Sequence, residues 1–478
     1  MQEEGLSLPH SRAMKHTAHG YWLEEAGAPT PAPPLDGEAS ADVVVVGAGF
    51  SGLWAAWHIK QLEPDARVVL LEGGRCGEGP SGRNGGFCNV MWASLPNMRK
   101  RWGDAPALAV ARAAEHSVAE IGSFCENEGV DAWFRRGGYL QVSTAPAHDS
   151  NWAEALAACR ELAAAEAVEA LSSADVAARC KAPTFRAGAF YPGAATVQPA
   201  RLALGLRDRL IAVGVEVNEN SPVRALRDSP GGVEARTPAG AVRARAAVIA
   251  VGGAATAPLG PLRNRITVAS SHIVLTEPVP DLLEEVGWTG GECITDSRAL
   301  IDYFRTTSDG RILFGWGGGR IAMGARLGGH SELDPGVVAQ TAAHLRACFP
   351  GLEGRRLTHA WGGPIDASPT HLPMVVALPG GSAFAAAGYT GNGVGPSHMV
   401  GRTLASLALD RRDDPSRLPF VDPSPPPLPP QPFQWIGAEA IRQGLIRKES
   451  AELAGRDPDP ISAAIASIPK RIGFHIGR

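Results

Sequence analysis

Three glycines and one glutamate near the N-terminus have the spacing of a dinucleotide-binding site. Gly47, Gly49 and Gly52 form a Gly-x-Gly-x-x-Gly motif, and Glu72 follows the last glycine by twenty residues. In this motif the first glycine permits a tight turn, the second lets the backbone approach a pyrophosphate, and the third allows a helix to pack closely on a strand. A carboxylate at the distance of Glu72 can accept hydrogen bonds from a ribose diol. The spacing therefore predicts a bound dinucleotide.

A strand, a helix and a second strand must position these residues, and the sequence predicts all three. An apolar run over 42–46 precedes the first glycine, a helix-compatible segment over 50–62 opens from the motif, and a second apolar run over 67–71 ends at the glutamate. The helix N-terminus presents free N–H groups and the positive end of its dipole, so we expect Phe50 and Ser51 at the phosphates.

The loop that follows the glutamate, residues 73–87, adds further candidate contacts. It is rich in glycine and has serine, arginine and asparagine interleaved, which suits a loop that lines a cofactor with backbone amides, with Arg83 near phosphate charge. The predicted cofactor contacts in this loop are Gly73, Ser81, Gly82, Arg83, Asn84, Gly85 and Gly86.

These segments together resemble the D-amino-acid oxidase/glycine oxidase superfamily of FAD-dependent amine oxidoreductases. The sequence Ser-Gly-Arg-Asn-Gly-Gly at 81–86 is most similar to the γ-glutamylputrescine oxidase-like branch, and the resemblance covers nearly the whole chain from residue 40. It implies FAD as the cofactor, with residues 81–86 along the pyrophosphate and the flavin edge.

Three later segments are similar to the same family. The resemblance implies that the backbone of Val223 contacts the adenine, that Gly252 and Gly253 end a strand near the ADP part, and that Trp361 lies beside the flavin ring system. A strand, glycine loop and helix over 384–409 also match. Such a helix N-terminus can stabilise the negative charge that a flavin gains on reduction. The contacts expected there are Gly388, Gly391, Asn392, Gly393 and Val394.

The resemblance also bears on how FAD is held. Some relatives attach the flavin covalently through a histidine or a cysteine. Here Asn84 stands where some relatives carry that histidine, and the loop over 388–394 has no cysteine, although Cys88 lies close to the motif at 81–86. We therefore expect FAD to be bound non-covalently.

The family's chemistry is the oxidation of an amine. Hydride leaves the carbon beside the amine nitrogen and passes to flavin N5, the imine hydrolyses, and O2 is reduced to H2O2. The expected substrate is a primary or secondary amine, either a polyamine derivative or an amino acid. The glycine run at 315–319 follows a strand but lacks the later acid of a nicotinamide site. Two alternatives stay open: a dehydrogenase that passes electrons to a quinone or carrier protein, and a flavin-binding subunit of a larger complex.

One strand supplies the candidate substrate residues. By alternation Ile301, Tyr303 and Arg305 share one face of the segment 299–305, and Asp302 lies on the other. Tyr303 could orient an amine, Arg305 could clamp a carboxylate, and Asp302 could pair with a cationic tail. Tyr303, Arg305 and Trp361 are the catalytic candidates, with ordinary roles in a sheet as the alternative.

The sequence predicts an α/β fold: a glutathione-reductase-like Rossmann FAD-binding domain with an inserted antiparallel-sheet substrate domain of α+β type. The predicted division is an N-terminal arm at 1–40, FAD-binding parts at 41–115, 185–265 and 355–415, substrate-domain parts at 116–184 and 266–354, and a proline-rich linker with a helical tail at 416–478. We expect the tail to pack on the body or on a second subunit of a homodimer.

Composition excludes several classes of protein. The 478 residues are 44% apolar and 20% charged with a net charge of −4, which does not favour nucleic acid as a partner. The seven cysteines contain no Cys-x-x-Cys pair, so we expect reduced thiols and no metal site. No apolar run reaches the ~20 residues of a membrane span, and no secretory signal opens the chain. The predicted location is cytoplasmic.

Overall fold

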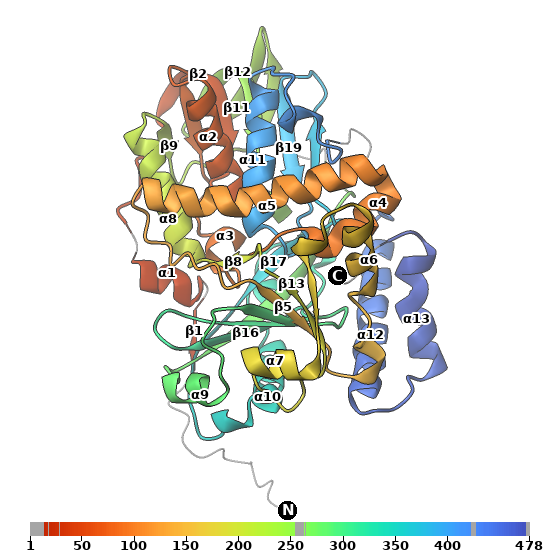
Figure 1. Cartoon of the computed structure of the whole chain (residues 1–478). Coiled ribbons are helices and arrows are strands. Elements are labelled where there is room, and N and C mark those ends of the chain that lie inside the picture. The colour runs from red at the N-terminus through yellow and green to blue at the C-terminus, as the bar shows by residue number, and fades with distance from the viewer. Residues whose placement is uncertain are drawn as a thin grey trace, which may run out of the picture.

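The computed structural model describes residues 14–17, 19–27, 29–253, 262, 264–421 and 427–474. Within these ranges the chain forms two large sheets, one above the other in Figure 1, with helices packed around them. One sheet is mainly parallel and the other mainly antiparallel, in agreement with the predicted pairing of a Rossmann domain and an antiparallel-sheet domain. The start of the predicted arm and residues 422–426 of the proline-rich segment lie outside the described residues.

The upper sheet carries the first motif. Its strand order is β10-β11-β12-β2-β3-β9, with β19 beside β12 and β18 beside β19. The valines at 43–46 are at most 3% exposed, as expected for a strand covered on both faces. Because β2, β12 and β19 run parallel, their carboxyl ends meet at one edge. The strands are β2 (Gly37–Val46), β3 (Val68–Leu71), β9 (Glu216–Asn218), β10 (Ala225–Ser229), β11 (Gly232–Arg236), β12 (Gly240–Ile249), β18 (Met374–Ala377) and β19 (Ala383–Ala387).

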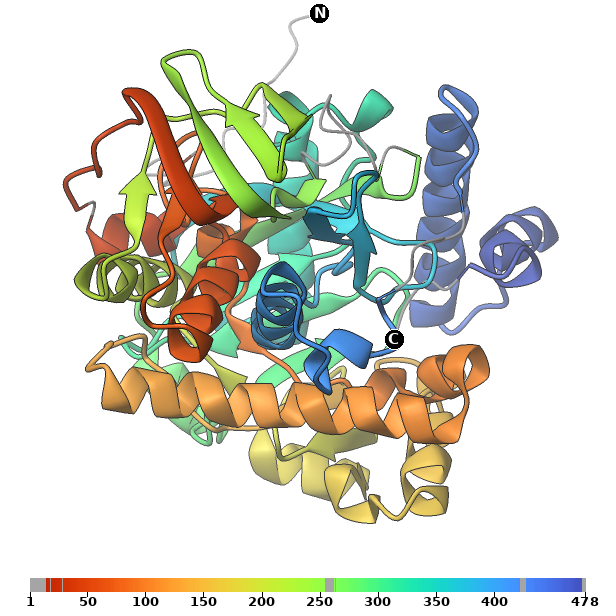
Figure 2. The same cartoon turned by 90° about the horizontal axis from the view of Figure 1, so that it is seen from above.

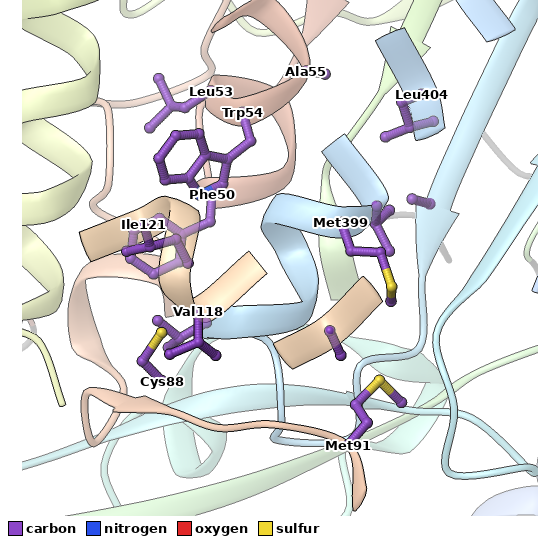
Figure 3. Close-up of a cluster of buried hydrophobic side chains, with 14 of the residues drawn as sticks. Phe50, Leu53, Trp54, Ala55, Cys88, Met91, Val118, Ile121, Met399 and Leu404 are labelled. Carbon is purple, nitrogen blue, oxygen red and sulfur yellow. The ribbon is translucent and has the colours of Figure 1, made fainter. Parts of the chain in front are cut away.

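Three helices pack together on this sheet. α2 (Phe50–Leu62) and α11 (Val394–Ala408) are so close that a Cβ on Gly401 would lie 2.6 Å from the Cβ of Trp54. The long helix α5 (Asp104–Asn127) crosses both, and Figure 3 shows the apolar side chains that fill the space between them. This packing holds the N-termini of α2 and α11 in fixed positions.

The lower sheet has the order β1-β17-β13-β16-β15-β14-β5-β7-β6 among the described residues. Helix α10 (Pro335–Cys348) packs against β13 and β16. The strands are β1 (Lys15–His16), β5 (Tyr139–Val142), β6 (Glu169–Leu171), β7 (Gly188–Tyr191), β13 (Thr267–Thr276), β14 (Cys293–Asp296), β15 (Asp302–Thr306), β16 (Ile312–Trp316) and β17 (Leu357–Ala367).

Two strands of the lower sheet come from segments that we predicted in the FAD-binding domain. β7 lies in the predicted part 185–265 and β17 in the predicted part 355–415, yet β7 pairs with β5 and β17 pairs with β13 along its whole length. Strand pairing between distant segments decides where such a boundary falls, and periodicity in one sequence does not reveal the partner.

Two other segments differ from the prediction. The predicted arm at 1–40 contains α1 (Gly20–Ala26), whose Trp22 is fully buried because its ring lies in an apolar cluster with residues of β13, β16 and β17 of the lower sheet. The alanine-rich tract over 151–181 is helix-prone by composition. It is interrupted by the edge strand β6, because pairing with β7 outweighs the helix propensity of alanine.

The C-terminal tail forms two helices, α12 (Phe433–Leu453) and α13 (Pro460–Arg471), which pack on each other at one side of the molecule (Figures 1 and 2). Among the described residues, no helix is both long and apolar enough to span a membrane. The remaining elements are α3 (Pro80–Arg83), β4 (Phe87–Cys88), α4 (Leu95–Trp102), α6 (Ala153–Glu161), α7 (Ser173–Arg179), β8 (Ala195–Thr196), α8 (Pro199–Ala212), α9 (Pro280–Glu285) and several short 3-10 turns.

Candidate active site

A cavity of about 950 Å³ is lined by residues of both sheets and of the tail. One end is built from the carboxyl ends of β2, β3 and β12, and the other from the faces of β13 and β15. A cavity of this size and shape can hold an extended cofactor together with a small substrate.

The glycine motif leaves no room for side chains. Gly47 has a φ of 99°, and a Cβ there would lie 2.5 Å from the carbonyl oxygen of Ala250. A Cβ on Gly49 would lie 2.9 Å from Ser81 Oγ, which accepts a hydrogen bond from the Phe50 amide. Gly47, Gly49, Phe50 and Ser51 all line the cavity. The backbone is therefore bare where the motif predicts a pyrophosphate.

Gly52 has a different part in the same turn. It does not line the cavity, and a Cβ on it would lie 1.9 Å from the carbonyl oxygen of Gly47. It allows α2 to begin directly against the turn, which is the packing function expected of the third glycine.

Glu72 lies at the end of β3 with its carboxylate on the cavity wall. Its two oxygens accept hydrogen bonds from the amides of Ala48 (2.7 Å) and Gly74 (2.9 Å). Burial raises the pKa of this carboxyl above its usual value. A carboxylate has about four lone-pair sites, so Glu72 keeps capacity to accept a ribose diol.

Some residues of the loop after Glu72 line the cavity, and others support the loop from behind. Gly73, Ser81, Arg83, Asn84 and Gly85 line the cavity. The side chain of Asn84 also shapes the loop, because its Oδ1 accepts from the Gly86 amide at 2.7 Å and its Nδ2 donates to the Ser81 carbonyl at 2.8 Å.

Gly82 and Gly86 lie behind that wall. A Cβ on either would come within 2.2 Å of a backbone oxygen, that of Gly77 or of Val197 respectively. These two glycines thus permit the loop to pack closely and are not placed to touch a ligand in the cavity.

Two buried tryptophans hold the loop from behind. The indole of Trp22 donates to the carbonyl of Asn84 (2.8 Å), and the indole of Trp361 donates to the carbonyl of Arg83 (2.7 Å). The two rings meet edge to face at 6.5 Å. Trp361 is fully buried and does not line the cavity, so it supports the loop instead of lying beside the ring system as expected. Trp22 was missed, since nothing local in the N-terminal segment indicates its partner.

The other predicted cofactor contacts from the upper sheet reach the same cavity. Val223, Gly252 and Gly253 line it, as do Gly391, Asn392, Gly393 and Val394 at the N-terminus of α11. Gly388 does not line the cavity. Its amide donates to Asp366 Oδ2 at 2.7 Å, and burial raises the pKa of Asp366 to about 6.

Tyr389 is a cavity residue that the sequence did not single out. Its hydroxyl lies 2.6 Å from the Ser51 hydroxyl and so joins the loop before α11 to the start of α2. A pair of hydroxyls more than three hundred positions apart in sequence leaves no local signal.

At the other end of the cavity, the side chain of Tyr303 extends from β15 to β13 along the cavity wall. Its hydroxyl lies 2.7 Å from Ser271 Oγ, which itself donates to the carbonyl of Trp316 at 2.9 Å. Because the single proton of Ser271 is used on that carbonyl, the hydroxyl of Tyr303 donates to Ser271. The oxygen of Tyr303 is left as an acceptor, and burial raises its pKa far enough that the phenol stays neutral.

Arg305 and Asp302 do not reach the cavity. Arg305 shares a face with Tyr303, but its buried guanidinium passes under the loop and donates to the carbonyls of Val197 (2.5 Å) and Gly86 (3.2 Å). Asp302 pairs with Arg298 on the opposite face. The expected carboxylate clamp at Arg305 and the expected partner for a cation at Asp302 are therefore not part of the cavity wall.

The chain matches the family model described as DAO, FAD dependent oxidoreductase, over residues 42–407. The protein belongs to this family. It is 25% identical over 404 residues to the probable oxidoreductase OrdL of Haemophilus influenzae, covering 83% of this chain and 89% of the relative. It is 27% identical over 402 residues to the γ-glutamylputrescine oxidoreductase of Escherichia coli, covering 82% and 89%. Glycine oxidase from Geobacillus kaustophilus is similar in structure, with a TM-score of 0.66 and 19% identity over 80% of this chain and 98% of that chain. These findings confirm the predicted family, fold class and FAD cofactor.

The cavity of this DAO-family enzyme fits FAD. The side-chain-free turn at Gly47 and Gly49 suits the pyrophosphate, and Glu72 suits the ribose. Cys88, the thiol nearest in sequence to the motif at 81–86, is fully buried in the apolar cluster of Figure 3 and does not line the cavity. Burial raises its pKa, which keeps it a thiol. None of the seven cysteines forms a disulfide bond, and all seven are buried.

Proposed function

We propose that this enzyme oxidises a primary or secondary amine, giving an imine that hydrolyses to a carbonyl compound and reducing O2 to H2O2. The observation that carries the proposal is one continuous cavity joining the dinucleotide end, with Glu72, to the hydroxyl of Tyr303 on the lower sheet. The names of two relatives, γ-glutamylputrescine oxidoreductase and glycine oxidase, support an amine or amino acid as the substrate. Bound FAD supplies a hydride acceptor at N5 for the C–H bond beside the amine nitrogen.

Tyr303 orients the amine. Tyr303 lines the cavity and its hydroxyl oxygen has acceptor capacity left, so it can accept an N–H and fix the direction of the neighbouring C–H bond. The cavity-lining residues of β13 and β15 are Thr267, Ala269, Ser271, Ile273 and Tyr303. They carry no carboxylate, imidazole or amine that could act as a general base, and their low polarity favours the neutral amine over the ammonium.

The N-terminus of α11 faces the opposite part of the cavity. Residues 391–394 line it there, and the helix leaves its first amides without helical acceptors. The positive end of the helix dipole stabilises the negative charge that accompanies reduction of the cofactor.

An anaerobic absorbance titration of the FAD-loaded enzyme tests the proposal. The panel consists of polyamines, γ-glutamyl amines, N-methyl amines and amino acids. Bleaching of the flavin band by one class supports amine oxidation. Bleaching by dithionite but by no amine would refute it. Admitting air then separates the oxidase from the dehydrogenase alternative, since an oxidase recovers its colour quickly and forms H2O2.

A further inference from the structure

Helix α12 of the tail is fixed to the body near both of its ends. Near its start, the side-chain amide of Gln434 donates to Thr267 Oγ1 at 2.8 Å. Near its end, Glu449 accepts from the amides of Ala299 (2.7 Å) and Leu300 (3.1 Å). Thr267, Ala299 and Leu300 all line the cavity, so the helix spans the cavity from one wall segment to another.

Between those two attachments the tail presents apolar side chains to the cavity. Ala438, Ile441 and Leu445 follow one another at intervals of three and four residues, so they share one helix face. Ile468, Ile472 and Phe474, from α13 and the residues after it, line the same cavity. We call these six residues the tail wall.

Charged groups near the tail wall are already neutralised. Arg442 is buried, its Nε donates to the carbonyls of Gly318 (2.9 Å) and Gly319 (2.6 Å), and its Nη1 donates to Glu439 at 2.7 Å. Among the cavity-lining residues of the described tail, none is aspartate or glutamate. Glu332, which lines the cavity from another segment, lies 4.0 Å from Arg83.

We propose that the tail wall binds the part of the substrate remote from the reacting C–N bond, and that this part is an uncharged alkyl or aryl group. The inference rests on the proposed amine oxidation and narrows its substrate class to monoamines. A second ammonium at this end would lose its water without gaining a carboxylate partner, which is costly. Each methylene buried there should strengthen binding about threefold to fourfold.

Two matched ligand series test the proposal on the FAD-loaded enzyme. One is n-butylamine, n-hexylamine and n-octylamine, and the other is 1,4-diaminobutane, 1,6-diaminohexane and 1,8-diaminooctane. Affinity is read anaerobically from the perturbation of the flavin spectrum, whether or not reduction follows. We expect affinity to rise with length in the monoamines and each diamine to bind at least tenfold more weakly than the monoamine of equal length.

The outcomes separate this inference from the function on which it rests. Any of three results would overturn the tail-wall assignment. The diamines could bind as well as the monoamines, the affinities could be independent of chain length, or neither series could perturb the flavin spectrum. Monoamines that show the expected length dependence, while no amine of any class reduces the flavin, would refute amine oxidation and leave the apolar site in place.

Two variants and a control locate the effect. Leu445→Ala should weaken the binding of n-octylamine severalfold and leave the affinity for n-butylamine unchanged. Ile441→Glu should reverse the selectivity in favour of 1,6-diaminohexane, because it supplies the missing carboxylate. Arg447→Ala changes an exposed residue of the same helix and should alter neither series. If Ile441→Glu fails to retain FAD, Leu445→Ala still decides: equal losses for all chain lengths would mean that the tail is only structural.

Discussion

The indole N–H of Trp361 donates a 2.7 Å hydrogen bond to the main-chain oxygen of Arg83. Trp361 lies on β17 of the lower, mainly antiparallel sheet, so this strand holds the loop that follows β3 of the upper, mainly parallel sheet. Trp22 makes the equivalent bond to the next residue, Asn84. The loop that faces the cavity is thus fixed by side chains that never enter it. This arrangement ties cofactor affinity to residues outside the binding surface.

Replacing Trp361 with phenylalanine should weaken FAD binding roughly fivefold, since one hydrogen bond of about 1 kcal/mol is lost while the ring packing is largely kept. Titration of the apoprotein with FAD, followed by flavin fluorescence, measures the change. Trp57→Phe, at a partly buried tryptophan that does not line the cavity, is the control. Unchanged affinity in Trp361→Phe would show that the loop keeps its shape without this bond.

Tyr303→Phe should slow flavin reduction roughly tenfold or more and leave FAD content unchanged, because the amine loses its acceptor while the ring still packs against Phe87. Stopped-flow reduction under anaerobic conditions gives the rate. Ser271→Ala, which removes the acceptor of the Tyr303 hydroxyl and the donor to the Trp316 carbonyl but keeps the Tyr303 oxygen, should have a smaller effect. Equal rates in Tyr303→Phe and the wild type would exclude the orienting role.

Arg305→Met should lower stability without changing the preference between amino acids and simple amines. The change removes the Arg305 donor from the buried carbonyl of Val197 and one of the two donors of the Gly86 carbonyl, whose other donor is the Val197 amide, at a cost of about 2 kcal/mol. Burial already lowers the pKa of Arg305 to about 10. Thermal unfolding and relative flavin reduction by glycine and n-butylamine are the two measurements. A selective loss of activity with glycine would restore the carboxylate clamp.

Glu449 should make stability depend on pH. Burial raises its pKa from 4.5 to about 7, so its contribution to stability is fully present below pH 4.5 and is lost as the pH rises through 7. Glu449→Gln keeps an oxygen acceptor for the amides of Ala299 and Leu300 but cannot ionise. It should unfold at the same temperature as the wild type at pH 4 and at a higher temperature at pH 8, where its free energy of unfolding should be larger by up to about 3 kcal/mol. A difference in melting temperature between Glu449→Gln and the wild type that is the same at both pH values would contradict this assignment.

FAD should leave the protein completely on acid denaturation. Cys88 is buried away from the cavity, and the Asn84 side chain is engaged within its own loop. The test is absorbance at the flavin maximum in the supernatant and in the redissolved pellet. Yellow colour that remains with the pellet would demonstrate a covalent link.

The sequence predicted the parts of this structure that depend on neighbouring residues. The turn at Gly47 and Gly49 is defined within a few positions by the absence of a Cβ, and Glu72 follows at the end of the next strand. The hairpin over 233–245, where β11 and β12 pair, likewise depends on residues close together in sequence. Steric constraints between residues that are close in sequence can be recognised from one sequence.

Contacts between distant segments were not predictable in the same way. Alternation placed Tyr303 and Arg305 on one face correctly, yet only the fold shows that the first faces the cavity and the second lies under the 86–197 contact. The family resemblance implied that Trp361 lies beside the flavin ring system, whereas its indole donates to the carbonyl of Arg83 at the back of the loop. The partners of Asp366 and Tyr389 likewise come from other elements.

The tail also bears on the order in which the enzyme is completed during synthesis. The glycine turn and Glu72 are translated early, whereas the residues of α12 and α13 that line the cavity lie at 433–471. A nascent chain still held by the ribosome can present the dinucleotide turn but lacks one side of its reaction chamber. Water therefore has free access to that chamber until α12 and α13 have folded onto the body, so the reaction chamber is completed later than the dinucleotide turn.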